Sequence, residues 1–210
     1  TQNVDLYYFT GSMQTGYACI PAEGEPVFFV RRSVARAREE SSVRVEPLDS
    51  MRSFAERLAR KYPELRANAS PVVATEFDVL PVREMQRLEK ALPQVRWVDG
   101  SNWVREIRMI KTDDEIAVIH RAAALVNEAF EHAAAQVRVG MPEFELMANI
   151  EHYMRLRGHL GFMRMRSYNQ ELITGMVAAG AAAAMPTYFD GPAGGQGLSP
   201  ASPQSSGARP

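Results

Sequence analysis

The sequence predicts an α/β first half followed by an α+β second half. Short apolar runs alternate with helical patterns up to residue 98, an order that is typical of strands and helices packed in layers. From residue 112 onward, apolar positions recur at alternating spacings of three and four, which predicts one long helix. A second helical pattern follows it directly, and a short apolar run comes next.

The first half opens with a short apolar, aromatic segment, Asn3–Gly11, which ends at a turn residue. Residues 17–20 and 27–30 flank a segment with two prolines and a glycine, which predicts a β-hairpin. The remaining elements are predicted as a polar helix over 33–40, a strand over 43–47, a helix over 51–62, a strand over 71–74, a helix over 82–92 and a strand over 95–98.

The second half begins with a capping box, because Glu115 follows Thr112 by three residues. The helix that it opens has about six turns with one apolar face and is expected to end at Gly140. Pro142 opens the second helix, which Gly158 closes, and residues 172–179 are expected to form a strand. Gly, Pro and Ser make up 13 of the 21 residues from 190 to 210, which predicts a loop.

Composition excludes several classes of function. The formal net charge is −1, so no overall field favours nucleic acid or an anionic membrane. The longest alanine-rich apolar run, Met176–Met185, is too short to cross a bilayer. A single cysteine, Cys19, rules out an internal disulfide and fits a reducing compartment. We therefore expect a cytoplasmic protein without nucleic-acid or membrane partners, and we expect both chain ends to be cut from a longer protein.

One stretch resembles a known family. The run from Arg105 through Lys111 to Glu115, followed by a helix, then Gly140 and a second helix, is similar to the start of a pita-bread metallohydrolase domain, the fold of creatinase, prolidase and Xaa-Pro aminopeptidase. Ahead of it, three segments in order resemble the creatinase-type N-terminal domain; they are Asn3–Gly11, Gly24–Pro26 and Asp78–Pro81.

The resemblance implies a domain organisation. Residues 1–104 would form the creatinase-like N-terminal α/β domain, without its first strand and helix. Residues 105–210 would form the first part of a truncated α+β pita-bread domain, with the Gly/Pro/Ser-rich loop at 190–210. Residues 99–108 would link the two domains, with Trp103 packed at their junction.

The resemblance also implies a chemistry. Pita-bread peptidases hold two divalent ions (Mn, Co or Zn) through two Asp, one His and two Glu, and hydrolyse peptide bonds next to proline. In the family's order these ligands follow the loop that ends here at Pro210. The complete parent would thus bind two metal ions and a proline-containing peptide and form a homodimer. The 210-residue chain itself is expected to be inactive, with no catalytic residue and no metal ligand.

The substrate-contacting residues are expected at Thr187 and Tyr188. The family often places a histidine in a segment like Ala-Leu-Pro-His-Tyr, and the corresponding segment here is Ala-Met-Pro-Thr-Tyr at 184–188. Thr187 therefore stands where that histidine would be. The alternative interpretation is an ordinary turn at a strand end.

Other candidate motifs favour structural roles. The four histidines show no metal-binding spacing and are expected on the surface or in packing; they are His120, His132, His152 and His159. Four arginines form the densest basic stretch and are expected to pair with glutamates of the two helices rather than with an anionic partner; they are Arg155, Arg157, Arg164 and Arg166. Two further hypotheses stay open: a non-catalytic pita-bread binding protein, and a creatinase-like hydrolase of a small guanidino compound.

Overall fold

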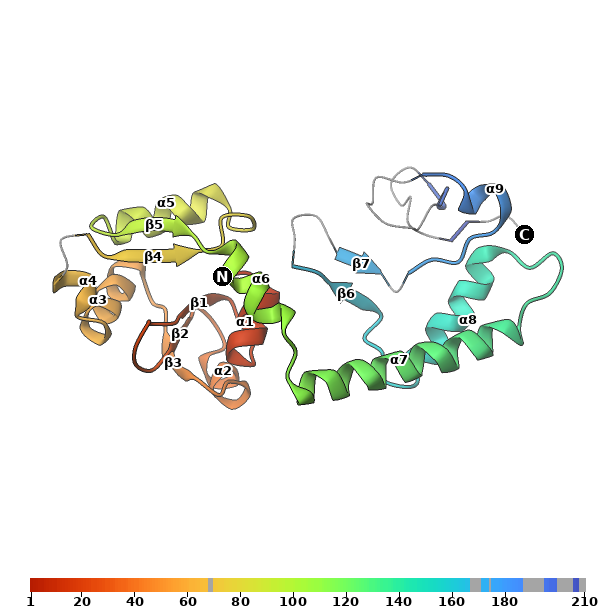
Figure 1. Cartoon of the computed structure of the whole chain (residues 1–210), viewed down its shortest axis with the longest axis horizontal. Coiled ribbons are helices and arrows are strands. Elements are labelled where there is room, and N and C mark those ends of the chain that lie inside the picture. Colours follow the sequence, from red (N-terminus) through yellow and green to blue (C-terminus); the bar gives the residue numbers. More distant parts are fainter. Residues whose placement is uncertain (68–69, 167–170, 174, 187–194, 200–205, 208–210) are drawn as a thin grey trace. The chain divides into compact units, whose positions relative to one another are not determined.

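The computed structural model describes residues 1–67, 70–166, 171–173, 175–186, 195–199 and 206–207 (Figure 1). The chain divides into two compact units. The first unit comprises Thr1–Ile110 together with Met165–Gln170, and the second comprises Lys111–Arg164 together with Glu171–Pro210.

The first unit contains a three-stranded sheet of β1 (Gly16–Cys19), β2 (Val27–Val30) and β3 (Arg44–Pro47). Strand β2 lies in the middle and pairs antiparallel with β1, where Gly16 faces Val30 and Cys19 faces Val27. This pairing confirms the predicted hairpin. On its other side β2 pairs in parallel with β3.

Helices cover both faces of this sheet, which confirms the layered α/β prediction. All four side chains of β2 are fully buried, and successive side chains point to opposite faces. Val27 and Phe29 pack in one core with Phe54 of α3 (Met51–Lys61). Phe28 and Val30 pack in a second core with residues of α1 (Asn3–Thr10) and α2 (Val34–Glu40).

A second, two-stranded sheet completes the first unit. Strands β4 (Val72–Thr75) and β5 (Arg96–Asp99) pair in parallel. Between them along the chain lies α5 (Val82–Ala91), whose Leu88 joins the same core as Phe54. The short helix α4 (Glu64–Ala67) adds Leu65 to this core.

Three helices of the first unit were not predicted, and the short helix α4 is one of them. Segment 3–11 forms α1, which Gly11 ends at a φ of 79° while its N–H donates to the Tyr7 carbonyl at 2.8 Å. Its apolar residues are consecutive rather than spaced by three and four, so the sequence shows no helical period there. Segment 99–108, expected to link two domains, contains α6 (Ser101–Met109), on which Trp103 is 56% exposed.

The second unit begins with the two predicted helices, α7 (Asp113–Ala134) and α8 (Glu143–Arg155). The capping box at Thr112 is confirmed: its Oγ1 accepts from the Glu115 amide at 3.3 Å, and its own amide donates to the Glu115 carboxylate at 2.8 Å. Helix α7 ends at Ala134 rather than near Gly140. The residues between them form turns instead of a further helical turn.

The apolar face of α7 is only partly buried. Ala129 and Ala133 are buried, and the His132 ring stacks on Tyr153 of α8 with 4.2 Å between the ring centroids. Val126 and Phe130, which belong to the same predicted face, are 59% and 74% exposed. The predicted apolar face of α7 is therefore largely exposed at these positions, while Ala129, Ala133 and His132 lie on the buried side of the helix.

A short antiparallel pair follows, β6 (Phe162–Arg164) with β7 (Glu171–Ile173). The predicted strand over 172–179 is shorter than expected, since β7 ends at Ile173 and α9 (Gly180–Ala183) begins soon after. Of the predicted loop 190–210, only 195–199 and 206–207 belong to the described residues. Among the helices of the described residues, none has the length and apolarity needed to traverse a lipid bilayer.

Candidate functional site

The predicted substrate-contacting residues, Thr187 and Tyr188, lie outside the described residues. The structure does describe the backbone on either side of them. Helix α9 precedes them, and residues 206–207 follow them along the chain.

A buried carboxylate, Glu143, holds both of these flanking segments. It stands at the start of α8 and is 6% exposed. One of its oxygens accepts from the Ala179 amide at 2.8 Å, and the other accepts from the Gly207 amide at 2.9 Å. Hydrogen bonds from backbone amides to a carboxylate are charge-assisted and therefore stronger than neutral ones. Glu143 thus fixes the two ends of a segment that contains both predicted substrate residues.

Ser206 strengthens the same arrangement. Its hydroxyl, almost fully buried, accepts from the Val177 amide at 2.8 Å. The Phe144 amide on α8 donates to the Gly207 carbonyl at 3.1 Å. Residues at the start of α8 therefore bind two described parts of the C-terminal segment, one before and one after Thr187 and Tyr188.

Within the described residues, no group of three or more His, Cys, Asp or Glu side chains could hold a metal ion. The histidines that the structure brings into contact have packing roles. His132 stacks on Tyr153, and the His159 Nδ1 accepts from the Gly161 amide at 2.9 Å. Burial raises the pKa of the Cys19 thiol to about 12, so this cysteine stays protonated and is a poor nucleophile.

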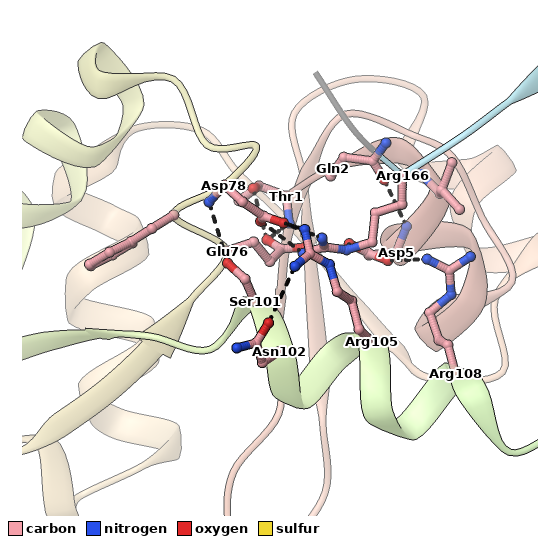
Figure 2. A network of polar contacts seen from close by, with 12 residues as sticks. Thr1, Gln2, Asp5, Glu76, Asp78, Ser101, Asn102, Arg105, Arg108 and Arg166 are labelled. Carbon is pink, nitrogen blue, oxygen red and sulfur yellow. Dashed lines mark hydrogen bonds and ion pairs between the residues drawn. The ribbon is translucent and has the colours of Figure 1, made fainter. Parts of the chain in front are cut away.

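A network of charged side chains lies in the first unit (Figure 2). Asp5 stands in the first turn of α1, where the Gln2 side chain caps the helix by accepting from the amides of Val4 and Asp5. Glu76 and Asp78 follow β4, and helix α6 carries Arg105 and Arg108. We call Asp5, Glu76, Asp78, Arg105, Arg108 and Arg166 the carboxylate–arginine cluster.

Arg166 is the central cation of this cluster. Its Nε donates to one Asp5 oxygen at 2.6 Å, and its two terminal nitrogens donate to the two Asp78 oxygens at 2.6 and 3.1 Å. Its side chain is only 5% exposed. Each carboxylate also has a second arginine: Arg108 donates to Asp5 at 2.9 Å, and Arg105 donates to Asp78 at 2.6 Å.

The cluster shifts the pKa values of its members in different directions. Burial and the neighbouring Glu76 carboxylate raise the pKa of Asp5 above its ordinary value, although Arg166 acts in the opposite direction. At Asp78, burial would also raise the pKa, but hydrogen bonds from Arg166 and Ser101 outweigh it and lower the pKa. The two carboxylates outweigh burial at Arg166 and raise the pKa of its guanidinium, which therefore stays charged.

These contacts decide what the cluster can do chemically. Both carboxylate oxygens of Asp5 and both of Asp78 accept hydrogen bonds from guanidinium groups. They are therefore not arranged to bind a divalent ion or to accept a proton from a substrate. The cluster therefore has a structural role: its ion pairs connect segments of the first unit that are far apart in sequence. Arg166 reaches it across 161 positions from Asp5 and 88 from Asp78.

A largely apolar groove of about 740 Å³ is a further feature of the first unit. It lies along α5 and β5 and is lined mainly by apolar side chains, including Met85, Leu92 and Trp97. Glu89 is the only titratable side chain in its lining. The groove therefore lacks the set of converging polar groups that a catalytic site needs.

The roles of Glu143, Asp5 and Arg166 were not predicted from the sequence. Glu143 has the signature of an ordinary first-turn helix residue, and nothing in the sequence signals that it is buried. The expected pairing of arginines with helical glutamates describes Arg157, which lies 3.6 Å from Glu128 of α7. It does not describe Arg166, whose partners lie far away in sequence.

Two family models match the chain, one after the other. Residues 1–110 match the model of the creatinase/prolidase N-terminal domain, and residues 117–202 match that of metallopeptidase family M24. The chain belongs to the creatinase/prolidase family. Both matched domains occur in the order that the sequence predicts, and the M24 domain is present in part.

Individual relatives agree with this assignment. Over 159 residues the chain is 25% identical to the Xaa-Pro dipeptidase of Pyrococcus horikoshii, an alignment that covers 75% of this chain and 42% of that protein. The crystal structure of the prolidase from the same organism matches with a TM-score of 0.63 at 24% identity, covering 77% of this chain and 46% of the other.

A second solved structure shows the same fold. The X-Pro aminopeptidase of Thermotoga maritima matches with a TM-score of 0.63 at 23% identity, covering 76% of this chain and 45% of that protein. This creatinase/prolidase family chain thus spans less than half the length of each of these three proteins.

Proposed function

We propose that this chain is part of a metal-dependent hydrolase that cleaves peptide bonds next to proline. The observation that carries the proposal is the order of two family domains in one chain, a creatinase/prolidase N-terminal domain followed by part of a metallopeptidase domain. The similarity to an Xaa-Pro dipeptidase over three quarters of the chain supports the substrate class.

The described residues of this chain do not fit the metal ions of such an enzyme. Members of the family use two divalent ions, Mn, Co or Zn, and these need several converging oxygen and nitrogen ligands. The described residues offer no such group, and Asp5 and Asp78 contact arginines instead. The described residues therefore hold no metal ion in this proposal.

The 210 residues by themselves are accordingly proposed to be inactive. Support comes from the family's order, in which the two Asp, one His and two Glu ligands follow the Gly/Pro/Ser-rich loop at 190–210. The chain also covers only 42% of the dipeptidase to which it is similar. In this proposal, its part of the enzyme is the N-terminal domain and the helices and segment that border the substrate.

Thr187 and Tyr188 are the proposed substrate-contacting residues. They lie in the segment whose flanks Glu143 holds through the amides of Ala179 and Gly207. Threonine in place of the family's histidine would contribute a hydroxyl donor and acceptor without a titrating ring.

Two measurements test the proposal. The first is hydrolysis by the 210-residue chain of an Xaa-Pro dipeptide and of a matched dipeptide with alanine in place of proline, with Mn, Co or Zn and with EDTA. We expect no hydrolysis above background and no stoichiometric metal binding. Metal-dependent cleavage of the Xaa-Pro dipeptide, without cleavage of the alanine dipeptide, would overturn the proposed inactivity.

The second measurement is to sequence the reading frame that encodes this chain downstream of codon 210. Two Asp, one His and two Glu codons at the family's spacing would support the hydrolase, and the complete protein would then be assayed with the same peptides. A downstream reading frame without these ligands would contradict the catalytic proposal and favour a non-catalytic binding protein. Cleavage of a small guanidino compound but not of Xaa-Pro peptides would contradict the substrate class.

A further inference from the structure

Helix α7 presents a convex apolar surface. Ile119, Ala123, Val126 and Phe130 follow one another at spacings of four, three and four, so they lie on one side of the helix. We call these four residues the apolar stripe. All four are exposed. Helix α8 contacts a different side of α7, where His132 stacks on an α8 ring, so α8 leaves the stripe uncovered.

The first unit presents a concave apolar surface, the groove of about 740 Å³ along α5 and β5 (Figure 1). Its lining includes Phe77 and Val82, which are 46% and 73% exposed. Glu89 is the only titratable side chain among the described lining residues. A groove with so few polar groups is better suited to an apolar occupant than to a polar substrate.

The stripe has the spacing with which a helix docks in such a groove. Helices that bind in apolar grooves use anchors separated by three, four and seven residues, and Ile119, Ala123 and Val126 have these separations. Packing two stripes against each other would leave Phe77 and Val82 exposed to water. Docking a stripe in the groove removes both apolar surfaces from water at once, which favours this arrangement.

The size of the stripe also suits a stable contact. Ile119, Val126 and Phe130 are 51%, 59% and 74% exposed, so together they expose on the order of 350 Å² if each whole side chain counts for roughly 200 Å². A standard interface buries about 800 Å² per partner, of which somewhat more than half is apolar. The stripe therefore supplies most of the apolar area that one partner needs.

Polar groups beside the two surfaces are complementary. The Glu89 carboxylate belongs to the groove, and His120 follows Ile119 at the border of the stripe. Both side chains are exposed, and neither has a partner among the contacts that the structure describes. An imidazole N–H donates to a carboxylate, so the two can pair when the stripe enters the groove.

We infer that the apolar stripe of one copy of this chain docks in the groove of a second copy. The contact is heterologous, because the two surfaces that meet are different. Each copy carries one stripe and one groove. The contact does not depend on the proposed peptidase activity.

Two matched variants test this contact in the 210-residue chain. The stripe variant is Val126→Glu, Phe130→Glu, and the groove variant is Phe77→Glu, Val82→Glu. Each places two carboxylates at positions that are exposed in the structure. We expect each variant alone to self-associate at least about tenfold more weakly than the wild type, since two apolar contacts are lost. Sedimentation velocity over a range of concentrations measures the association.

The decisive sample is an equimolar mixture of the two variants. The groove variant keeps an intact stripe, and the stripe variant keeps an intact groove. We therefore expect the mixture to form pairs of two chains at concentrations where each variant alone is monomeric. Pairing in the mixture also shows that both variants are folded. If a Glu variant unfolds by circular dichroism, serine at the same positions replaces it in the same scheme.

The control is Tyr7→Glu, Ile20→Glu, which adds the same charge at two exposed positions outside both surfaces and should associate like the wild type. A groove variant that associates like the wild type would mean that stripes meet each other, and this would overturn the inference. A mixture that stays monomeric would overturn it too, as would a wild-type chain that is monomeric at every concentration.

Discussion

Asp5 and Asp78 share one guanidinium but respond differently to their surroundings, and this difference has consequences for pH. The pKa of Asp78 is lowered in the folded chain, so its ionised form stabilises the fold above its ordinary value of 3.8. That contribution is lost as the pH falls through the lowered folded value. The pKa of Asp5 is raised, so the folded chain favours its protonated form. The contribution of Asp5 to the free energy of unfolding therefore increases as the pH falls from the raised folded value to 3.8.

The first prediction concerns these two residues. Lowering the pH below about 4 should reduce the free energy of unfolding of the wild-type chain through Asp78. The Asp78→Asn variant should lose less stability over this range. Asp5→Asn should differ from the wild type at higher pH, because it lacks the gain in stability that Asp5 gives as the pH falls from its raised folded pKa to 3.8. Urea unfolding at a series of pH values from about 2 to about 7 gives the dependence of stability on pH for each variant. Equal slopes for both variants would contradict the assignment.

The second prediction concerns Glu143. In Glu143→Gln the side-chain amide can offer one oxygen to the amides of Ala179 and Gly207, and its NH₂ group then faces the other donor. An unsatisfied buried donor costs about 1–3 kcal/mol. We expect the Ala179 and Gly207 amides to exchange with deuterium at least about tenfold faster.

Glu145→Gln is its control, on the same helix turn but with a largely exposed partner, Arg138. Surface pairs of this kind contribute about 0–1 kcal/mol, so exchange at the two amides should stay close to wild type. Similar exchange in both variants would mean that Glu143 does not hold the two segments.

At the scale of the element, helix α1 depends on a glycine that closes it. Gly11 has a φ of 79°, and a Cβ built there would lie 2.8 Å from the Glu40 carbonyl oxygen. Gly24, in the hairpin turn, also has a positive φ, of 99°, but a Cβ there would meet nothing within 4 Å. The two positions therefore separate backbone strain from steric contact.

The third prediction follows from this comparison. Gly24→Ala should cost about 1 kcal/mol from the left-handed backbone alone. Gly11→Ala should cost more, about 2–4 kcal/mol, because the backbone of Glu40 must also shift. Chemical denaturation of both variants measures the difference, and equal losses would show that the contact with Glu40 is relieved without cost.

Most elements of the first unit were predictable because their apolar patterns are regular. Helix α3 shows Met51, Phe54 and Leu58 at spacings of three and four, and the hairpin is marked by its Gly and Pro turn. Helix α1 was missed because Leu6 to Phe9 are consecutive apolar residues with no period. The length of α7 was overestimated because the pattern continues to Val137 while the backbone leaves the helix after Ala134.

The candidate site was less predictable than the fold. The substrate-contacting role of Thr187 and Tyr188 was predicted from a family resemblance. It remains a prediction, because both residues lie outside the described residues. The partners of Arg166 could not be derived from local sequence, because a pair separated by 161 residues leaves no local signal. Glu143 is buried by segments that return to it from residues 179 and 207, which is equally a tertiary effect.

At the scale of the whole molecule, helix α7 carries several exposed apolar side chains. Ile119, Val126 and Phe130 are all more than half exposed on one helix. Apolar patches of this kind favour association. The homodimer expected from the family resemblance remains a proposal, and this face is one route by which copies of the chain could meet.

The fourth prediction is that the chain self-associates in a concentration-dependent way through this face. Val126→Glu combined with Phe130→Glu should weaken association at least about tenfold, since each removes an apolar contact worth about 1 kcal/mol or more. Ile20→Glu, at a 57% exposed position in the first unit, is the control. Size-exclusion chromatography with light scattering gives the mass, and a wild-type chain that is monomeric at all concentrations would contradict the prediction.

The position of Arg166 along the chain also bears on synthesis by the ribosome. Residues 1–110 are synthesised before Arg166, which follows Ile110 by 56 positions along the chain. At a synthesis rate of about 5–20 residues per second, this interval lasts about 3–11 s. Of the arginine contacts that the structure describes for Asp5 and Asp78, those with Arg108 and Arg105 can form during that time, and those with Arg166 can form only afterwards.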